Sequence, residues 1–96
     1  MITARAFPGR RYAVLGLARS GLATCAALIA SGAGVTAWDE REAARDAAMA
    51  LGADIGNPMA IDLVGFAGVV VSPGVPLNRH PIADHAREAG VPILGD

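Results

Sequence analysis

Residues 11–22 read RYAVLGLARSGL and decide the fold of this chain. The first five are mostly apolar and run straight into Gly16, a pattern typical of a short buried strand. From Leu22 to Ser31 the chain is apolar on nearly every side and then reaches Gly32, which predicts a buried helix with a glycine just beyond its end. A strand that turns through glycines into a helix is the opening of a parallel α/β unit.

The alternation of strand and helix continues along the rest of the chain. Further strands are predicted at 34–38, 53–55, 68–71 and 91–94. Further helices are predicted at 41–51, at 60–66, an ambiguous segment for which a short helix is favoured, and at 81–90. We therefore predict an α/β fold with a Rossmann-like, mostly parallel sheet of about five strands, helices on both faces and a strand order such as 3-2-1-4-5.

Length and composition indicate a single folded domain, residues 1–96. The chain is 53% hydrophobic and 18% charged, a balance that suits strands buried on both faces of a sheet. The net charge is −1 and no apolar stretch approaches the ~20 residues of a membrane span, so we expect neither nucleic acid nor membrane as a partner. Cys25 is the only cysteine, which excludes an intrachain disulfide and fits a cytoplasmic location.

Three loops are predicted to meet at one edge of the sheet. Ligands of open parallel sheets bind beyond the carboxyl ends of the strands. The loops at 16–21, 39–41 and 72–75 each follow a predicted strand, so all three belong to that edge. We expect a binding site, if the chain has one, to be built from these loops.

The first loop has the features of a phosphate site. Gly16 and Gly21 permit a tight turn, and the helix that follows presents free N–H groups and the positive end of its dipole to an anion. Ser20 adds a hydroxyl, as an N-cap or in the first turn of the helix. Ala18 stands where the usual dinucleotide pattern has glycine, and its methyl group narrows the approach of a pyrophosphate. The alternative is a tight turn that packs helix on strand and binds nothing.

The other two loops carry polar groups that each have two interpretations. Asp39 could accept hydrogen bonds from ribose hydroxyls or from a uracil ring N–H, or it could cap the following helix. Arg41 could reach a phosphate or stack on a base, or it could be a solvated helix start. In the third loop, Ser72-Pro73-Gly74 lets the backbone approach a sugar or phosphate, although the same tripeptide also forms ordinary turns.

No catalytic residue and no metal site are predicted. No cysteine or acid completes a ligand set with His80 and His85, so we expect surface histidines. Cys25 lies in the apolar helix and is interpreted as an inert core thiol. The chain has no Gly-x-x-x-x-Gly-Lys nucleotide loop and no Ser-His-Asp spacing that indicates a hydrolase.

Four stretches, in order, resemble the N-terminal domain of the Mur ligases. They read GLARSGL at 16–22, VTAWDER at 35–41, VSPGVPL at 71–77 and GVPILGD at 90–96. The Ser-Pro-Gly tripeptide is more similar to the branch of the family that adds D-glutamate than to the branch that adds L-alanine. Ala18 departs from the glycine that the family usually has at this place.

The resemblance implies a UDP-binding domain of a larger ligase that makes a peptidoglycan precursor. The residues implied to bind UDP-N-acetylmuramoyl-L-alanine are Arg19 and Ser20 for the diphosphate, Asp39 and Arg41 for the uridine, and Ser72 and Gly74 for the sugar side. By the same resemblance, a central domain binds ATP and magnesium, and a C-terminal domain brings D-glutamate. This chain would hold no cofactor itself, and its protein partner would be the rest of the ligase chain.

The sequence stops where the central domain would begin, so we expect a binding module without ligase or ATPase activity. Two alternatives stay open. One is an NAD(P)-binding domain of an oxidoreductase or regulator, which shares the fold, the glycine turn and an acid at the place of Asp39. The other is an interaction domain whose turns bind no nucleotide.

Overall fold

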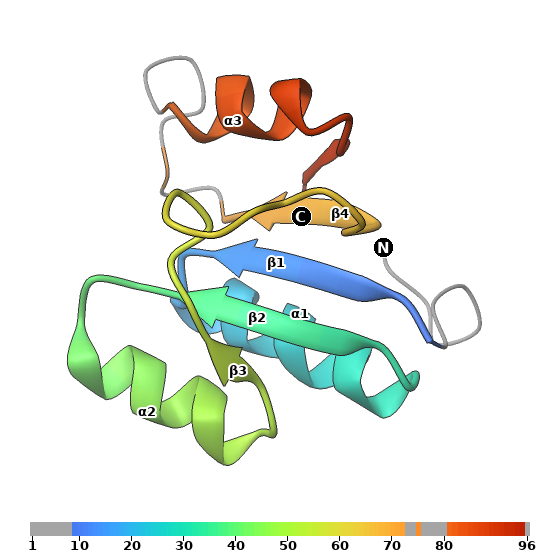
Figure 1. The fold of residues 1–96 in the computed structure, drawn as a ribbon. Coiled ribbons are helices and arrows are strands. Elements are labelled where there is room, and N and C mark those ends of the chain that lie inside the picture. Colours follow the sequence, from blue (N-terminus) through green and yellow to red (C-terminus); the bar gives the residue numbers. More distant parts are fainter. Residues whose placement is uncertain (1–8, 73–74, 76–80, 96) are drawn as a thin grey trace.

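The computed structural model describes residues 9–72, 75 and 81–95, which form an α/β fold around one sheet (Figure 1). Its elements are β1 (Arg11–Leu15), α1 (Arg19–Ala30), β2 (Gly34–Trp38), α2 (Glu42–Ala50), β3 (Asp54–Ile55), β4 (Gly68–Val71), α3 (Ile82–Glu88) and β5 (Ile93–Gly95). The sheet has 5 strands in the order β3-β2-β1-β4-β5, and every pair is parallel. The predicted fold class and strand order are confirmed.

The central strand, β1, shows why the deciding stretch is apolar without interruption. Strands β2 and β4 pair with β1 on its two sides, and its last four residues are all buried. Because side chains alternate along a strand, Tyr12 and Val14 belong to one core, and Ala13 and Leu15 belong to the other. A strand covered on both faces requires apolar residues at consecutive positions.

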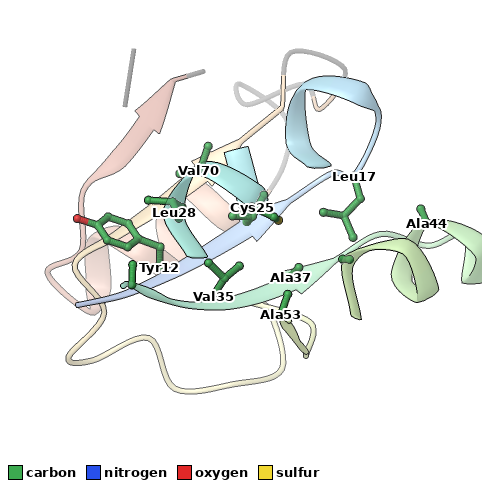
Figure 2. Packing of buried hydrophobic residues seen from close by; sticks show 12 residues of the cluster. Tyr12, Leu17, Cys25, Leu28, Val35, Ala37, Ala44, Ala53 and Val70 are labelled. Atoms are coloured by element: carbon green, nitrogen blue, oxygen red, sulfur yellow. The ribbon is translucent and has the colours of Figure 1, made fainter. Parts of the chain in front are cut away.

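The first core lies between the sheet and the helices α1 and α2. Figure 2 shows Cys25 and Leu28 of α1 beside Val70 of β4, and both of these helix residues are fully buried. Helix α2 contributes Ala44 and Ala48 to the same core. The full burial of Cys25 confirms its predicted place in the core, and this burial raises the pKa of its thiol to about 11.

The second core lies on the opposite face of the sheet. There, Ile82 and Ala86 of α3 share a buried cluster with Leu63 and Phe66 from the segment between β3 and β4. In Figure 1, α3 lies on the other side of the sheet from α1 and α2. Helices therefore cover both faces, as the sequence predicted.

The predicted short helix at 60–66 is wrong, because the segment forms turns. The side chains of Asn57 and Asp62 each accept a 2.9 Å hydrogen bond from the backbone N–H two residues further on. Such local bonds give the backbone an alternative to helical pairing. Gly65 then adopts a φ of 94°, a left-handed conformation that ends any helix. The apolar residues that suggested a helix instead anchor these turns in the second core.

Candidate functional site

The carboxyl ends of β1, β2 and β4 lie level with one another. Leu15 pairs in register with Trp38 on one side and with Val71 on the other, so all three strands leave the sheet at the same edge. Two hydrogen bonds continue these contacts beyond the strands: Gly16 N–H donates to the Trp38 carbonyl at 2.8 Å, and Ser72 N–H donates to the Leu15 carbonyl at 3.0 Å. The loops after these strands meet at this edge, as predicted.

The glycine loop, residues 16–21, is packed too tightly to admit a side chain at Gly16 or at Gly21. Gly16 has a φ of 91°, and its carbonyl accepts a 2.7 Å hydrogen bond from the hydroxyl of Ser72 at the end of β4. A Cβ atom at Gly21 would lie 2.0 Å from the Gly16 carbonyl oxygen, a distance at which something must shift. The two glycines therefore let the first turn of α1 rest directly on the end of β1.

The first turn of α1 has backbone N–H groups without an acceptor among the described residues. The helix begins at Arg19, earlier than predicted, and its N-cap residue, Ala18, is extended and makes no side-chain cap. Its first bond runs from Leu22 N–H to the Ala18 carbonyl, so the N–H groups of Arg19 and Ser20 have no acceptor within the helix. Both side chains are exposed, and neither has a bonded partner in the described part of the chain. Ser20 is thus a first-turn hydroxyl and not the N-cap.

The Asp39 carboxylate ties the glycine loop to the corner between β2 and α2. Its Oδ2 accepts a 2.8 Å hydrogen bond from Leu17 N–H, and its Oδ1 accepts one of 2.9 Å from Arg41 N–H. The Arg41 side chain adds bonds from Nε to Oδ1 at 3.1 Å and from Nη2 to Oδ2 at 3.4 Å. A carboxylate has about four acceptor positions, so protein donors already occupy those of Asp39. The Arg41 side chain and the two N–H groups lower the pKa of Asp39 to about 2.

Asp39 is not the N-cap of α2, the alternative role that the sequence allowed. The N-cap residue is Arg41, and no side chain caps this helix. The Arg41 side chain is 65% exposed, whereas that of Asp39 is 14% exposed. The hydrogen bonds to Asp39 also raise the pKa of Arg41. Arg41 is therefore an exposed cation whose Nε and Nη2 atoms donate to Asp39, while its Nη1 atom has no acceptor among the described residues.

Arg45, which the sequence analysis did not select, belongs to the same corner. Its Nη1 donates to the carbonyl of Asp39 at 2.8 Å and to that of Glu40 at 2.9 Å. Its guanidinium carbon also lies 4.8 Å from the centre of the Trp38 ring. The sequence signal for this arrangement is a Trp-Asp pair at the end of a strand, followed by an arginine about one turn into the next helix. From that position the arginine side chain reaches back to the carbonyls of the corner.

The structure brings together five of the six predicted substrate-binding residues. They are Arg19, Ser20, Asp39, Arg41 and Ser72, all on the three loops at the carboxyl edge. Gly74 lies outside the described residues. Ser72 is buried and its hydroxyl donates to the glycine loop, so its side chain supports that loop. The Ala18 methyl group is exposed at the mouth of the loop.

Other parts of the described chain offer no competing site. Within residues 9–72, 75 and 81–95, no cluster of three or more histidine, cysteine or acidic side chains could hold a metal ion. His85, part-buried, forms a 3.0 Å hydrogen bond between its Nε2 and the Ile61 carbonyl, whereas His80 lies outside the described residues. None of the described helices has the length and apolar character needed to cross a membrane. A shallow hollow beside α3 and the start of β5 shares no residue with the three loops.

Comparison with protein families finds one family for nearly the whole chain. Residues 10–95 match the model of the Mur ligase MurD-like, N-terminal domain. A UDP-N-acetylmuramoylalanine--D-glutamate ligase of Sphingopyxis alaskensis is 84% identical over all 96 residues, which are 22% of that protein. The ligase of the same name from Novosphingobium aromaticivorans is 68% identical, again over the whole chain and 21% of its own length. The chain thus spans about a fifth of the curated relatives it matches.

Solved structures show the same fold at low sequence identity. The acetophenone reductase of Geotrichum candidum, solved in complex with NAD, superposes with a TM-score of 0.68 at 19% identity. The match covers 96% of this chain and 35% of the reductase. This likeness bears on the sheet and its helices, and it assigns no ligand to the three loops.

Proposed function

Because residues 10–95 match its model, the chain belongs to the MurD-like N-terminal domain family of the Mur ligases, and we propose that it binds the UDP part of UDP-N-acetylmuramoyl-L-alanine. The names of its relatives state both the nucleotide substrate and D-glutamate. The whole protein is then a ligase that joins D-glutamate to this substrate in peptidoglycan precursor synthesis. One observation carries the binding proposal: the Asp39 carboxylate joins the glycine loop and an exposed arginine at one edge of the sheet, where we propose that the anion binds.

The diphosphate is proposed to bind at the start of α1. A helix N-terminus offers an anion its unpaired N–H groups and the positive end of the helix dipole. Arg19 and Ser20 add a cation and a hydroxyl, both exposed. Ala18 has a methyl group where a glycine would have a hydrogen atom. This methyl group limits how closely a phosphate can approach the backbone of the glycine loop.

The uridine is proposed to bind at the corner formed by residues 39–41. Arg41 is exposed there and can stack on the base or reach a phosphate. Asp39 remains a proposed contact of the uridine, but its acceptor positions are occupied by Leu17 and Arg41. We therefore assign it a positioning part, in which it holds the Arg41 side chain toward the ligand.

The sugar side is proposed to face the loop after β4. Ser72 acts here through the Gly16 carbonyl, which it holds by its hydroxyl. Gly74 stays a proposed contact on the argument of its conformational freedom. ATP and magnesium are assigned to the parts of the ligase beyond this chain, which by itself is proposed to bind substrate without catalysis. A cytoplasmic location remains proposed on the argument of the single cysteine.

An NAD(P) site is the second candidate, because a reductase of the same fold holds NAD. In such folds an acid at the end of the second strand accepts bonds from both ribose hydroxyls. Here that acid is Asp39, whose acceptor positions are filled by donors of the protein. A ribose diol, that of NAD(P) or that of uridine, would have to displace Arg41 or Leu17 to bond Asp39, so this residue does not separate the two candidates. The family match over residues 10–95 is what favours the UDP proposal.

The test is a titration of the chain with UDP, UDP-N-acetylmuramoyl-L-alanine and NAD, followed by backbone amide shifts. We expect UDP to shift Arg19, Ser20 and Arg41, with a Kd near the millimolar range, about 4 kcal/mol, because only one domain contributes contacts. The Arg41→Met variant should bind more weakly. Arg11→Met is the matched control, since Arg11 lies at the opposite end of β1. Shifts with NAD and none with either UDP ligand would replace this proposal by the oxidoreductase class.

A further inference from the structure

We propose that Arg45 is a positioning residue for the uridine, which acts by hydrogen-bonding the backbone of the corner at residues 39–41. This inference rests on the proposed function and deepens it, because it adds a residue that makes no contact with the ligand. Arg45 lies in α2 and is partly buried, whereas Arg41 at the mouth of the corner is exposed. In this proposal Arg45 stabilises the corner, and Arg41 contacts the ligand.

The corner has two carbonyl groups that Arg45 alone satisfies among the described residues. The carbonyls of Asp39 and Glu40 follow the last residue of β2 and precede the first residue of α2, so neither the sheet nor the helix pairs them. The Nη1 atom of Arg45 donates to both, at 2.8 and 2.9 Å. A single nitrogen thereby fixes two successive peptide planes of the corner.

Those two planes connect the Cα atom of Asp39 to that of Arg41, so they fix how the two residues lie relative to each other. The carboxylate reaches Leu17 N–H in the glycine loop, 22 residues earlier in the sequence, and orients the Arg41 guanidinium. A rearrangement of the corner would move the Arg41 N–H and guanidinium relative to the Asp39 carboxylate. Arg45 is therefore coupled to the glycine loop and to Arg41 through Asp39, without contacting either ligand-facing group by its own side chain.

Arginine suits this position better than lysine because its planar group serves two contacts at once. While Nη1 donates to the two carbonyls, the guanidinium lies over the Trp38 ring at 4.8 Å. Within the described residues, Arg45 forms no ion pair with a carboxylate. A lysine could reach the carbonyls, but it would lose the stacking of a flat cation on the ring.

The chain offers a built-in reporter for this contact. Trp38 is the only tryptophan, so its fluorescence reports directly on the guanidinium above it. The amide resonance of Leu17 reports on the Asp39 bond in the same way. Both signals can be read without ligand, which separates the positioning role from a general loss of stability.

The experiment compares Arg45→Met, Arg45→Lys and Arg11→Met with the wild-type chain. Methionine keeps much of the apolar stem and removes the donors. Arg11→Met is the matched control, because its guanidinium also lies over an aromatic ring, that of Phe66 at 4.4 Å, but at the other edge of the sheet. Each variant is titrated with UDP after a thermal melt has established the temperature range in which it is folded.

We expect Arg45→Met to raise the Kd for UDP about tenfold, Arg45→Lys about threefold, and Arg11→Met not at all, as the loss of charged hydrogen bonds predicts. The Trp38 emission and the Leu17 and Arg41 amide shifts should change in Arg45→Met before any ligand is added. Unchanged affinity and unchanged shifts in a folded Arg45→Met, or in Arg45→Lys if the former does not fold, would overturn the inference alone. Absence of UDP binding by the wild-type chain would overturn the proposed function as well.

Discussion

The Asp39 carboxylate receives hydrogen bonds from two sides of the site, and this explains why a single acid matters here. Leu17 donates from the glycine loop, and Arg41 donates from the start of α2 by its backbone and its side chain. The side chain is 14% exposed, so water competes little for these positions. At the residue scale, Asp39 is a side-chain cross-link between the glycine loop and the corner at residues 39–41.

The stability contributed by Asp39 should depend on pH in a defined direction. Its pKa is lowered from 3.8 to about 2, so its contribution is complete above about pH 4 and is lost as the pH falls toward 2. The shift corresponds to at most about 2.5 kcal/mol, and solvent screening of the exposed Arg41 reduces our expectation to about 1 kcal/mol. Urea unfolding of Asp39→Asn and wild type between pH 7 and pH 2 measures this difference.

The two curves should approach each other as the pH falls toward 2, where about half of the Asp39 carboxylates are protonated. Glu40→Gln is the control, because Glu40 is the exposed neighbour and its side chain has no bonded partner in the described part of the chain. A difference between Asp39→Asn and wild type that stays constant down to pH 2 would show that the carboxylate charge is not what joins the loops.

At the scale of elements, the segment between β3 and β4 covers the second core without forming a helix. Its turns place Leu63 and Phe66 under α3, while Val64 between them remains 66% exposed. A helix over the same residues would distribute its apolar side chains along a stripe, whereas turns can bury two and expose the third. The segment thus completes the second layer with a few anchoring side chains.

Neighbouring residues of this segment should respond very differently to truncation. Leu63→Ala is expected to lower the free energy of unfolding by about 2–5 kcal/mol, because the side chain is fully buried and its loss leaves a cavity. Val64→Ala is expected to stay within about 0.5 kcal/mol of wild type. Chemical denaturation of the two variants makes the comparison. Equal effects would mean that the segment does not pack against the second core.

At the scale of the whole molecule, the two cores pack on opposite faces of one sheet, so loss of the sheet would disrupt both cores. Cys25 lies in the first core, fully buried between α1 and the sheet (Figure 2). Burial raises its thiol pKa to about 11, so the reactive thiolate is scarce at neutral pH even before access is considered. This single thiol can therefore report on opening of the whole fold.

Labelling of Cys25 by a thiol reagent at pH 8 should be slow and should follow global unfolding. We expect the rate to rise with urea in parallel with the loss of Trp38 fluorescence, because both probes lose their environment in one transition. The Leu63→Ala variant should label faster, with the logarithm of the rate rising in proportion to the lost free energy of unfolding, although the substitution lies in the other core. Rapid labelling in the absence of denaturant would show that α1 opens independently of the sheet.

The sequence by itself determined the sheet. It placed β1, β2 and β4 at their observed residues, because an uninterrupted apolar run that meets a glycine or a polar residue is a local signal of a strand covered on both faces. Parallel pairing followed from the alternation with helices, whereas the strand order was only the one expected for this layout and is decided by the structure. The meeting of the three loops at the carboxyl edge also followed, since parallel strands all end on one side. The helix predicted at 60–66 is wrong because local side-chain hydrogen bonds favour turns there. Whether such turns replace a helix depends on whether Leu63 and Phe66 can be buried from them, which the sequence alone does not show.

Only the tertiary structure decided what each side chain of the site does. Asp39 bonds a residue 22 positions away, and Ser72 bonds one 56 positions away. The sequence marks both residues as polar groups at strand ends, but it cannot distinguish a free acceptor from one occupied by the protein. That difference depends on angstrom-scale placement of distant backbone donors, and the same placement gives Arg45 its role. The pattern of residues along the chain predicts which residues lie at the same edge of the sheet. Their hydrogen-bond partners depend on the distances between loops at that edge, which only the tertiary structure gives.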